Sequence, residues 1–147
     1  MNWERKKVRV PCLSERAWSV LYAASDDWEN IETISNIIRR LIELSAKTPE
    51  YLPERKAWPN GPVRQEILKI LRSLHARGLV RAAREIGQVL QPVMRLDDLE
   101  RDPESYWFLA NEDLRALLLE LSFQRRGGVP LDELKAMCGE EVEVLMD

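Results

Sequence analysis

The stretch from Lys6 to Ala46 constrains the fold most, because its hydrophobic period changes from two to that of a helix. It opens with Val8, Val10 and Cys12 on one side and mainly charged residues on the other. Period two predicts a strand, since successive side chains of a strand point to opposite faces. Ser14 follows and offers a hydroxyl to cap a helix.

A second helical pattern comes after a short break at residues 26–32. Its apolar positions recur at helical spacing and define one stripe, and Thr33 or Ser35 can start the helix. The stripe consists of Ile34, Ile37, Ile38, Leu41 and Ile42. The order is therefore strand, helix, short connection and helix. The whole stretch has the size of one supersecondary unit.

The segments KKVRVPCLSE and ETISNIIRRLI resemble the ribbon-helix-helix family of DNA-binding proteins over the first third of the chain. The resemblance implies a homodimer whose paired N-terminal strands enter the major groove. It also implies that the backbone amides at the start of the second helix bind a phosphate. Pro11 departs from the pattern, because proline cannot donate a ladder hydrogen bond. The DNA-binding residues that the resemblance implies are Arg5, Lys7, Arg9, Thr33, Ser35 and Asn36.

Residues 49–62 carry four prolines and the turn dipeptide Asn60-Gly61, which predict a stiff linker. We therefore divide the chain into a ribbon-helix-helix-like module of residues 1–48, the linker of residues 49–62, and a helical C-terminal domain of residues 63–147.

Helical spacing predicts most of the C-terminal domain, with helices over 62–77, 79–91 and 112–124 and a last short helix from Pro130. Asn111 is a suitable cap for the third of these helices. The tail alternates apolar and charged residues, so it either adds a strand or frays. The predicted fold class is mainly α, a short N-terminal strand followed by a multi-helix bundle.

Charge is unevenly placed along a chain whose net charge is -3. The overall sign argues against a protein that coats nucleic acid over its whole surface. A basic cluster lies near the N-terminus, and a second basic region lies on the helices predicted after the linker. Arginines are common on the solvent-exposed faces of amphipathic helices and need no binding role there. Several arginines on one helix face can, however, contact phosphates. This second set comprises Arg64, Arg72, Arg77, Arg81 and Arg84.

Recognisable catalytic chemistry is missing from the sequence. His75 is the single histidine, and neither a zinc-ligand spacing nor a phosphate-binding glycine loop is present. We therefore expect a protein that is not an enzyme and that has no cofactor or metal. Cys12 and Cys138 are far apart, which predicts free thiols in a reducing cytoplasm. No apolar run is long enough for a transmembrane helix, and we expect no membrane partner.

Three functions remain open at this point, of which the third, an accessory protein that inhibits an enzyme through its acidic surface, is not separated by sequence from the second. The first is a DNA-binding transcriptional regulator or antitoxin-like protein that uses an N-terminal ribbon and binds a protein partner through its acidic C-terminal helices. The second is an all-α, non-catalytic subunit of a larger protein or nucleoprotein complex, which contacts a nucleic acid backbone or proteins through helix-face arginines. A stable monomer would favour the second, because one strand and two helices cannot bury a core alone.

Overall fold

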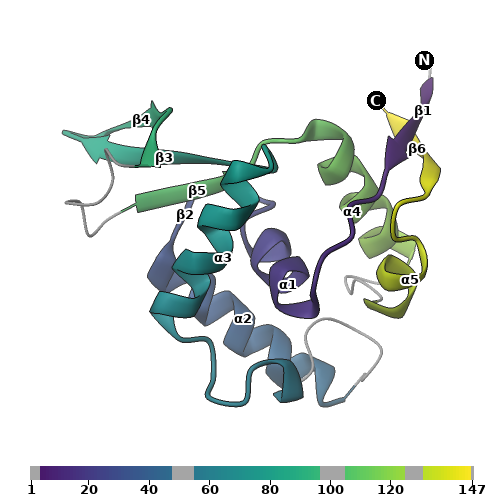
Figure 1. The fold of residues 1–147 in the computed structure, drawn as a ribbon, viewed down its shortest axis with the longest axis horizontal. Helices are drawn as coiled ribbons and strands as arrows, with labels where there is room; N and C mark the ends of the chain where they lie inside the picture. The colour runs from purple at the N-terminus through teal and green to yellow at the C-terminus, as the bar shows by residue number, and fades with distance from the viewer. Residues whose placement is uncertain (1–3, 48–54, 97–104, 125–130, 147) are drawn as a thin grey trace.

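The computed structural model describes residues 4–47, 55–96, 105–124 and 131–146, and within them the fold is mixed α/β (Figure 1). The elements are β1 (Glu4–Arg9), α1 (Glu15–Ala23), β2 (Glu29–Asn30), α2 (Ile31–Ser45), the 3-10 helix η1 (Arg55–Ala57), α3 (Arg64–Ala76), β3 (Val80–Ile86), β4 (Val89–Val93), β5 (Ser105–Leu109), α4 (Glu112–Gln124), α5 (Leu131–Ala136) and β6 (Glu141–Met146). The strands form two antiparallel sheets, so the prediction of a mainly α bundle is wrong.

Helix α1 is the centre of the core. It begins where the sequence predicts, because the Ser14 hydroxyl accepts a hydrogen bond from the Ala17 amide at 3.1 Å. Trp18 and Leu21 are fully buried, and α1 packs against both α2 and α3. Burial of a leucine side chain such as Leu21 contributes about 1.5–3 kcal/mol to the free energy of folding. The packing of these buried side chains is why this short helix organises the other two.

Helix α2 begins earlier than predicted. The Asn30 carboxamide caps it, accepting a hydrogen bond from the Thr33 amide at 2.8 Å, so neither Thr33 nor Ser35 is the cap. Ser35 is buried and donates its hydroxyl to the Pro62 carbonyl at 2.9 Å. This bond ties α2 to the start of α3.

A β-hairpin replaces the helix predicted over 79–91, and that prediction is wrong. Gly78 (φ 73°) ends α3, and Gly87 (φ 67°) lies in the two-residue loop between the paired residues Ile86 and Val89. Only glycine takes such positive φ values without strain, and the β-branched residues of this segment favour strands. Pro92 is tolerated because β4 is the edge strand of the sheet.

The four-stranded sheet has the order β2-β5-β3-β4. Its strand β5 contains the aromatic run from Tyr106 to Phe108 and lies between β2 and β3. In Figure 1 this sheet lies on one side of the helices, and the two-stranded β1–β6 ribbon lies on the other. The C-terminal tail thus forms a strand.

A disulfide joins Cys12 to Cys138, so the prediction of free thiols is wrong. Antiparallel pairing of β1 with β6 brings the two ends of the chain together. Val10 continues this pairing beyond the ribbon, because its carbonyl accepts from the Gly139 amide at 2.9 Å. The two cysteine Cα atoms are 4.7 Å apart, within the range that a disulfide spans.

Helix α4 has the predicted bounds, and the Asn111 side chain caps it by accepting from the Leu114 amide at 3.0 Å. It packs against both strands of the ribbon. Among the described helices, none combines the length and the apolar character that crossing a bilayer requires.

Candidate nucleic-acid interface

The outer face of α3 is polar and open to solvent. Ile67, Leu71 and Leu74 bury the opposite face against α1 and α2. Residues three, four and seven positions apart lie on one side of a helix, and all such outward positions here are exposed. The exposed side chains of this face are Gln65, Lys69, Arg72, Ser73 and Ala76, with Arg64 and Arg77 near the two ends.

The segment from Pro62 to Val93 contains two carboxylates, Glu66 and Glu85, and each has a partner outside the outer face of α3. Glu66 pairs with Arg16 at 3.1 Å, and Glu85 accepts a hydrogen bond from the Tyr106 hydroxyl at 3.3 Å. From Pro62 to Val93 the chain has six Lys/Arg against two Asp/Glu, a net of +4, although the whole chain is at -3. The segment is therefore the basic part of an acidic protein.

The register of the hairpin separates Arg81 from Arg84. Val80 and Ala82 are buried on the face that carries Trp107, whose ring meets His75 of α3 edge-on with centroids 6.3 Å apart. Strand side chains alternate, so Arg84 lies on this α3-facing side and Arg81 on the opposite side. Of the two, only Arg84 belongs to the same surface as the outer face of α3.

The tip of the hairpin is apolar and exposed. Ile86 and Val89 are 45% and 62% exposed and share the face of Arg84, since each strand alternates. Figure 1 shows β3 and β4 projecting away from the helices. We name this combination of the outer face of α3 with Arg84 and the hairpin tip the α3–hairpin surface.

The ribbon carries the other predicted cations. Arg5, Lys7 and Arg9 share the outward face of β1, as their alternation predicts, but β6 places carboxylates among them. Arg5 lies 3.6 Å from Glu143, and Arg9 lies 3.1 Å from Glu141. Lys7 is opposite Glu143 in the register, so this face is almost neutral.

The strand partner of β1 in the structure is β6 of the same chain. Lys6 points to the other side of the ribbon, where it pairs with Asp113 of α4 at 3.0 Å. Pairing between the ribbons of two chains, which the family resemblance implies, stays a prediction.

The start of α2 is surrounded by carboxylates. The Thr33 amide and the Ser35 hydroxyl already have intramolecular partners, and Asn36 is exposed. Burial raises the pKa of Glu29 above its ordinary value, and the charges of Asp27 and Asp26 raise it further. This negative environment disfavours a phosphate, and a DNA contact by Thr33, Ser35 and Asn36 stays a prediction.

Gln65, Lys69 and the hairpin tip are parts of this surface that the sequence reasoning missed. For the hairpin tip, the available signal was Gly87 in a two-residue break between the β-branched residues Ile86 and Val89. Within the described residues, no group of His, Cys, Asp and Glu is placed to hold a metal ion. The chemistry that the surface offers is anion binding and hydrogen bonding.

Comparison with known proteins yields no match to a protein-family model, to a curated protein or to a solved structure.

Proposed function

We propose that this protein binds duplex DNA through the α3–hairpin surface and acts as a DNA-binding regulator. The element order is α1, β2, α2, α3 and the hairpin, with β5 returning between β2 and β3. Helix-turn-helix proteins place the second helix of a packed pair in the major groove, and by analogy α3, which packs against α2, would take that place here. The connection from α2 to α3 is longer than the usual turn of three or four residues.

The concentration of cations on one exposed helix face beside a projecting hairpin carries the proposal. An arginine or lysine that contacts a phosphate releases a counterion from DNA, and this release drives binding. Of the two nearby carboxylates, Glu66 pairs with Arg16, and Glu85 lies on the opposite face of β3 from Arg84.

Positions on α3 suggest separate roles. Gln65, Lys69 and Arg72 lie on one side of the helix, where glutamine suits adenine and arginine or lysine suits guanine in the major groove. Arg64 and Arg77 lie near the ends of the helix, where they would contact the phosphate backbone. Arg84 extends the positive surface onto the hairpin, and the apolar tip suits a contact with the minor groove.

The test compares two surfaces at equal change of charge. Lys69→Ala with Arg72→Ala removes two cations from α3, and Lys7→Ala with Arg9→Ala removes two from the ribbon. Binding of a fluorescent mixed-sequence duplex is measured by anisotropy over a series of salt concentrations. We expect the α3 variant to bind at least about tenfold more weakly, with a salt slope smaller by roughly 1.8, and the ribbon variant to bind like the parent protein.

Each outcome of this test is decisive. Loss of binding in the ribbon variant alone would favour the ribbon-helix-helix mode of contact and contradict the α3–hairpin surface. A parent protein that fails to bind duplexes even at low salt would overturn DNA binding altogether. Circular dichroism spectra of both variants check that the fold is kept.

A further inference from the structure

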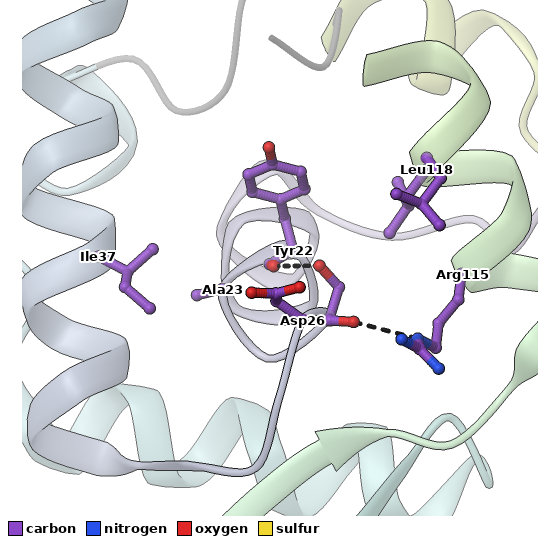
Figure 2. A pocket seen from close by; sticks show the side chains of 8 residues that line it. Tyr22, Ala23, Asp26, Ile37, Arg115 and Leu118 are labelled. Atoms are coloured by element: carbon purple, nitrogen blue, oxygen red, sulfur yellow. Dashed lines mark hydrogen bonds between the residues drawn. The ribbon is translucent and has the colours of Figure 1, made fainter. Parts of the chain in front are cut away.

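A cavity of about 360 Å³ lies where the end of α1 meets α2 and α4. Figure 2 shows Ile37 of α2 on one side, Leu118 and Arg115 of α4 on the other, and the end of α1 between them. Small-molecule sites have volumes of roughly 300–1,000 Å³, are mainly apolar and contain a few convergent polar groups. The cavity has the size and the composition of such a site.

The apolar part of the lining comes from three helices. Leu118 is buried, Ala23 is buried and Ile37 is half-buried, whereas Leu119 is 55% exposed at the rim. An aliphatic or aromatic group of a ligand would lose water on entering this part, which gives a favourable free energy of transfer.

The charged part of the lining consists of Arg115 and Asp26. Arg115 is held in place, because its Nε donates to the Ser25 carbonyl at 3.1 Å and its guanidinium lies 4.8 Å from the centre of the Phe108 ring. Its terminal nitrogens form no ion pair with any described residue, and the same is true of the Asp26 carboxylate. One cavity thus presents a cation and an anion that do not pair with each other.

We propose that this cavity binds a free α-amino acid with an apolar side chain. The ligand carboxylate pairs with the guanidinium of Arg115, which suits two-point binding of a carboxylate. The ligand ammonium group pairs with Asp26, and the side chain packs against Leu118 and Ile37. A zwitterion fits because it supplies both charges at once, whereas a simple acid or amine leaves one protein charge without a partner. This ligand site is separate from the α3–hairpin surface and does not depend on DNA binding.

The first experiment separates the three parts of the ligand. Isothermal titration calorimetry is run on the full chain with leucine, phenylalanine and methionine, each beside its analogue without the amino group and its analogue without the carboxylate. We expect at least one amino acid to bind at least about tenfold more tightly than both of its analogues, since each lost charged contact costs a factor of that order. No binding of any amino acid at concentrations up to about 10 mM, or equal binding of an analogue, would overturn the proposal.

The second experiment uses two neighbouring aspartates. Both carboxylates are exposed but only Asp26 lines the cavity, so Asp26→Asn removes a lining charge and Asp27→Asn removes a charge outside the lining. We expect Asp26→Asn to weaken binding of the best amino acid about tenfold without weakening its amine-free analogue, and Asp27→Asn to leave both affinities unchanged. Equal effects of the two substitutions would show that only the overall charge matters, and would contradict the proposed site.

Discussion

Whether an arginine is available to bind a phosphate depends on the contacts that it already makes in the protein. Arg9 and Arg72 differ in this respect. Arg9 donates to the Gly139 carbonyl and to Glu141, both at 3.1 Å, so DNA would have to replace existing contacts. Arg72 is exposed and has no ion pair among the described residues. Exposed ion pairs are worth only about 0–1 kcal/mol, but each also cancels the field that attracts a phosphate.

Glu29 gives a prediction about pH. Its pKa in the folded protein lies above the ordinary value of 4.5, because burial and the charges of Asp27 and Asp26 disfavour its carboxylate form. As pH rises through the ordinary pKa, Glu29 ionises first in the unfolded chain, so the free energy of unfolding falls. This loss of stability is complete above the pKa of Glu29 in the folded protein. Glu29→Gln removes this cost, so we expect the variant to be more stable than the parent at neutral pH.

Urea unfolding at a series of pH values checks this prediction. The gain in the free energy of unfolding should shrink as the pH falls and vanish below the ordinary carboxyl pKa. Glu32→Gln removes one exposed carboxylate near the start of α2 and controls for the change in net charge. A gain from Glu29→Gln that is the same at every pH would contradict the assigned cause.

At the scale of elements, the sequence predicted the caps of α1 and α4 and the two faces of β1, but not the cap of α2. Ser14 caps α1, Asn111 caps α4, and the outward and inward faces of β1 follow the alternation of its residues. These features are local, because a cap bonds to an amide three residues away and a stripe depends on spacing alone.

The helix predicted over 79–91 failed for a physical reason. Val80, Ala83, Ile86 and Leu90 fit a helical stripe, and the same segment contains the β-branched residues and the glycine turn of a hairpin. Short apolar segments satisfy both periods, and pairing with a distant strand decides between them. Here β5 supplies that pairing, and no local signal placed it beside β3. The α3–hairpin surface was therefore only half predictable, from its arginines alone.

The pairing of Cys12 with Cys138 was equally hidden, because 126 positions separate the two residues. Only the antiparallel ribbon, followed by the contacts of Val10 with Gly139 and Glu140, brings them together. Cysteine spacing alone does not reveal such a bond, and the argument for a reducing compartment that rested on free thiols no longer holds.

The disulfide gives a prediction about the ribbon. Cross-linking two residues so far apart restricts the unfolded chain, and such bonds typically contribute about 2–4 kcal/mol. We expect Cys12→Ser to lower the free energy of unfolding by that amount under non-reducing conditions. Urea unfolding monitored by circular dichroism measures the change, and Cys12→Ser with Cys138→Ser is the matched variant without a leftover thiol.

A reductant provides the control for this prediction. In its presence the parent protein should become as unstable as the variants, and the variants should not change. Labelling of both cysteines by iodoacetamide in the folded, non-reduced parent would contradict the bond.

At the scale of the whole molecule, the structure separates two surfaces that the sequence treats alike. The ribbon and the four-stranded sheet lie on opposite sides of the helices (Figure 1). Arg5 and Arg9 of the ribbon pair with Glu143 and Glu141 of β6, whereas Lys69 and Arg72 of α3 form no ion pair with any residue that the structure describes. An acidic protein can therefore approach DNA with one face while the rest of its surface repels the polyanion, which orients the encounter.

A titration of the ¹⁵N-labelled full chain with a short duplex, followed by amide chemical shifts, tests the central claim most directly. The account predicts that the largest shift changes fall on residues 64–76 and 80–93, that they weaken as salt is added, and that β1 and β6 are little affected. Shift changes confined to residues 4–9 and 141–146, or no changes at low salt, would contradict it.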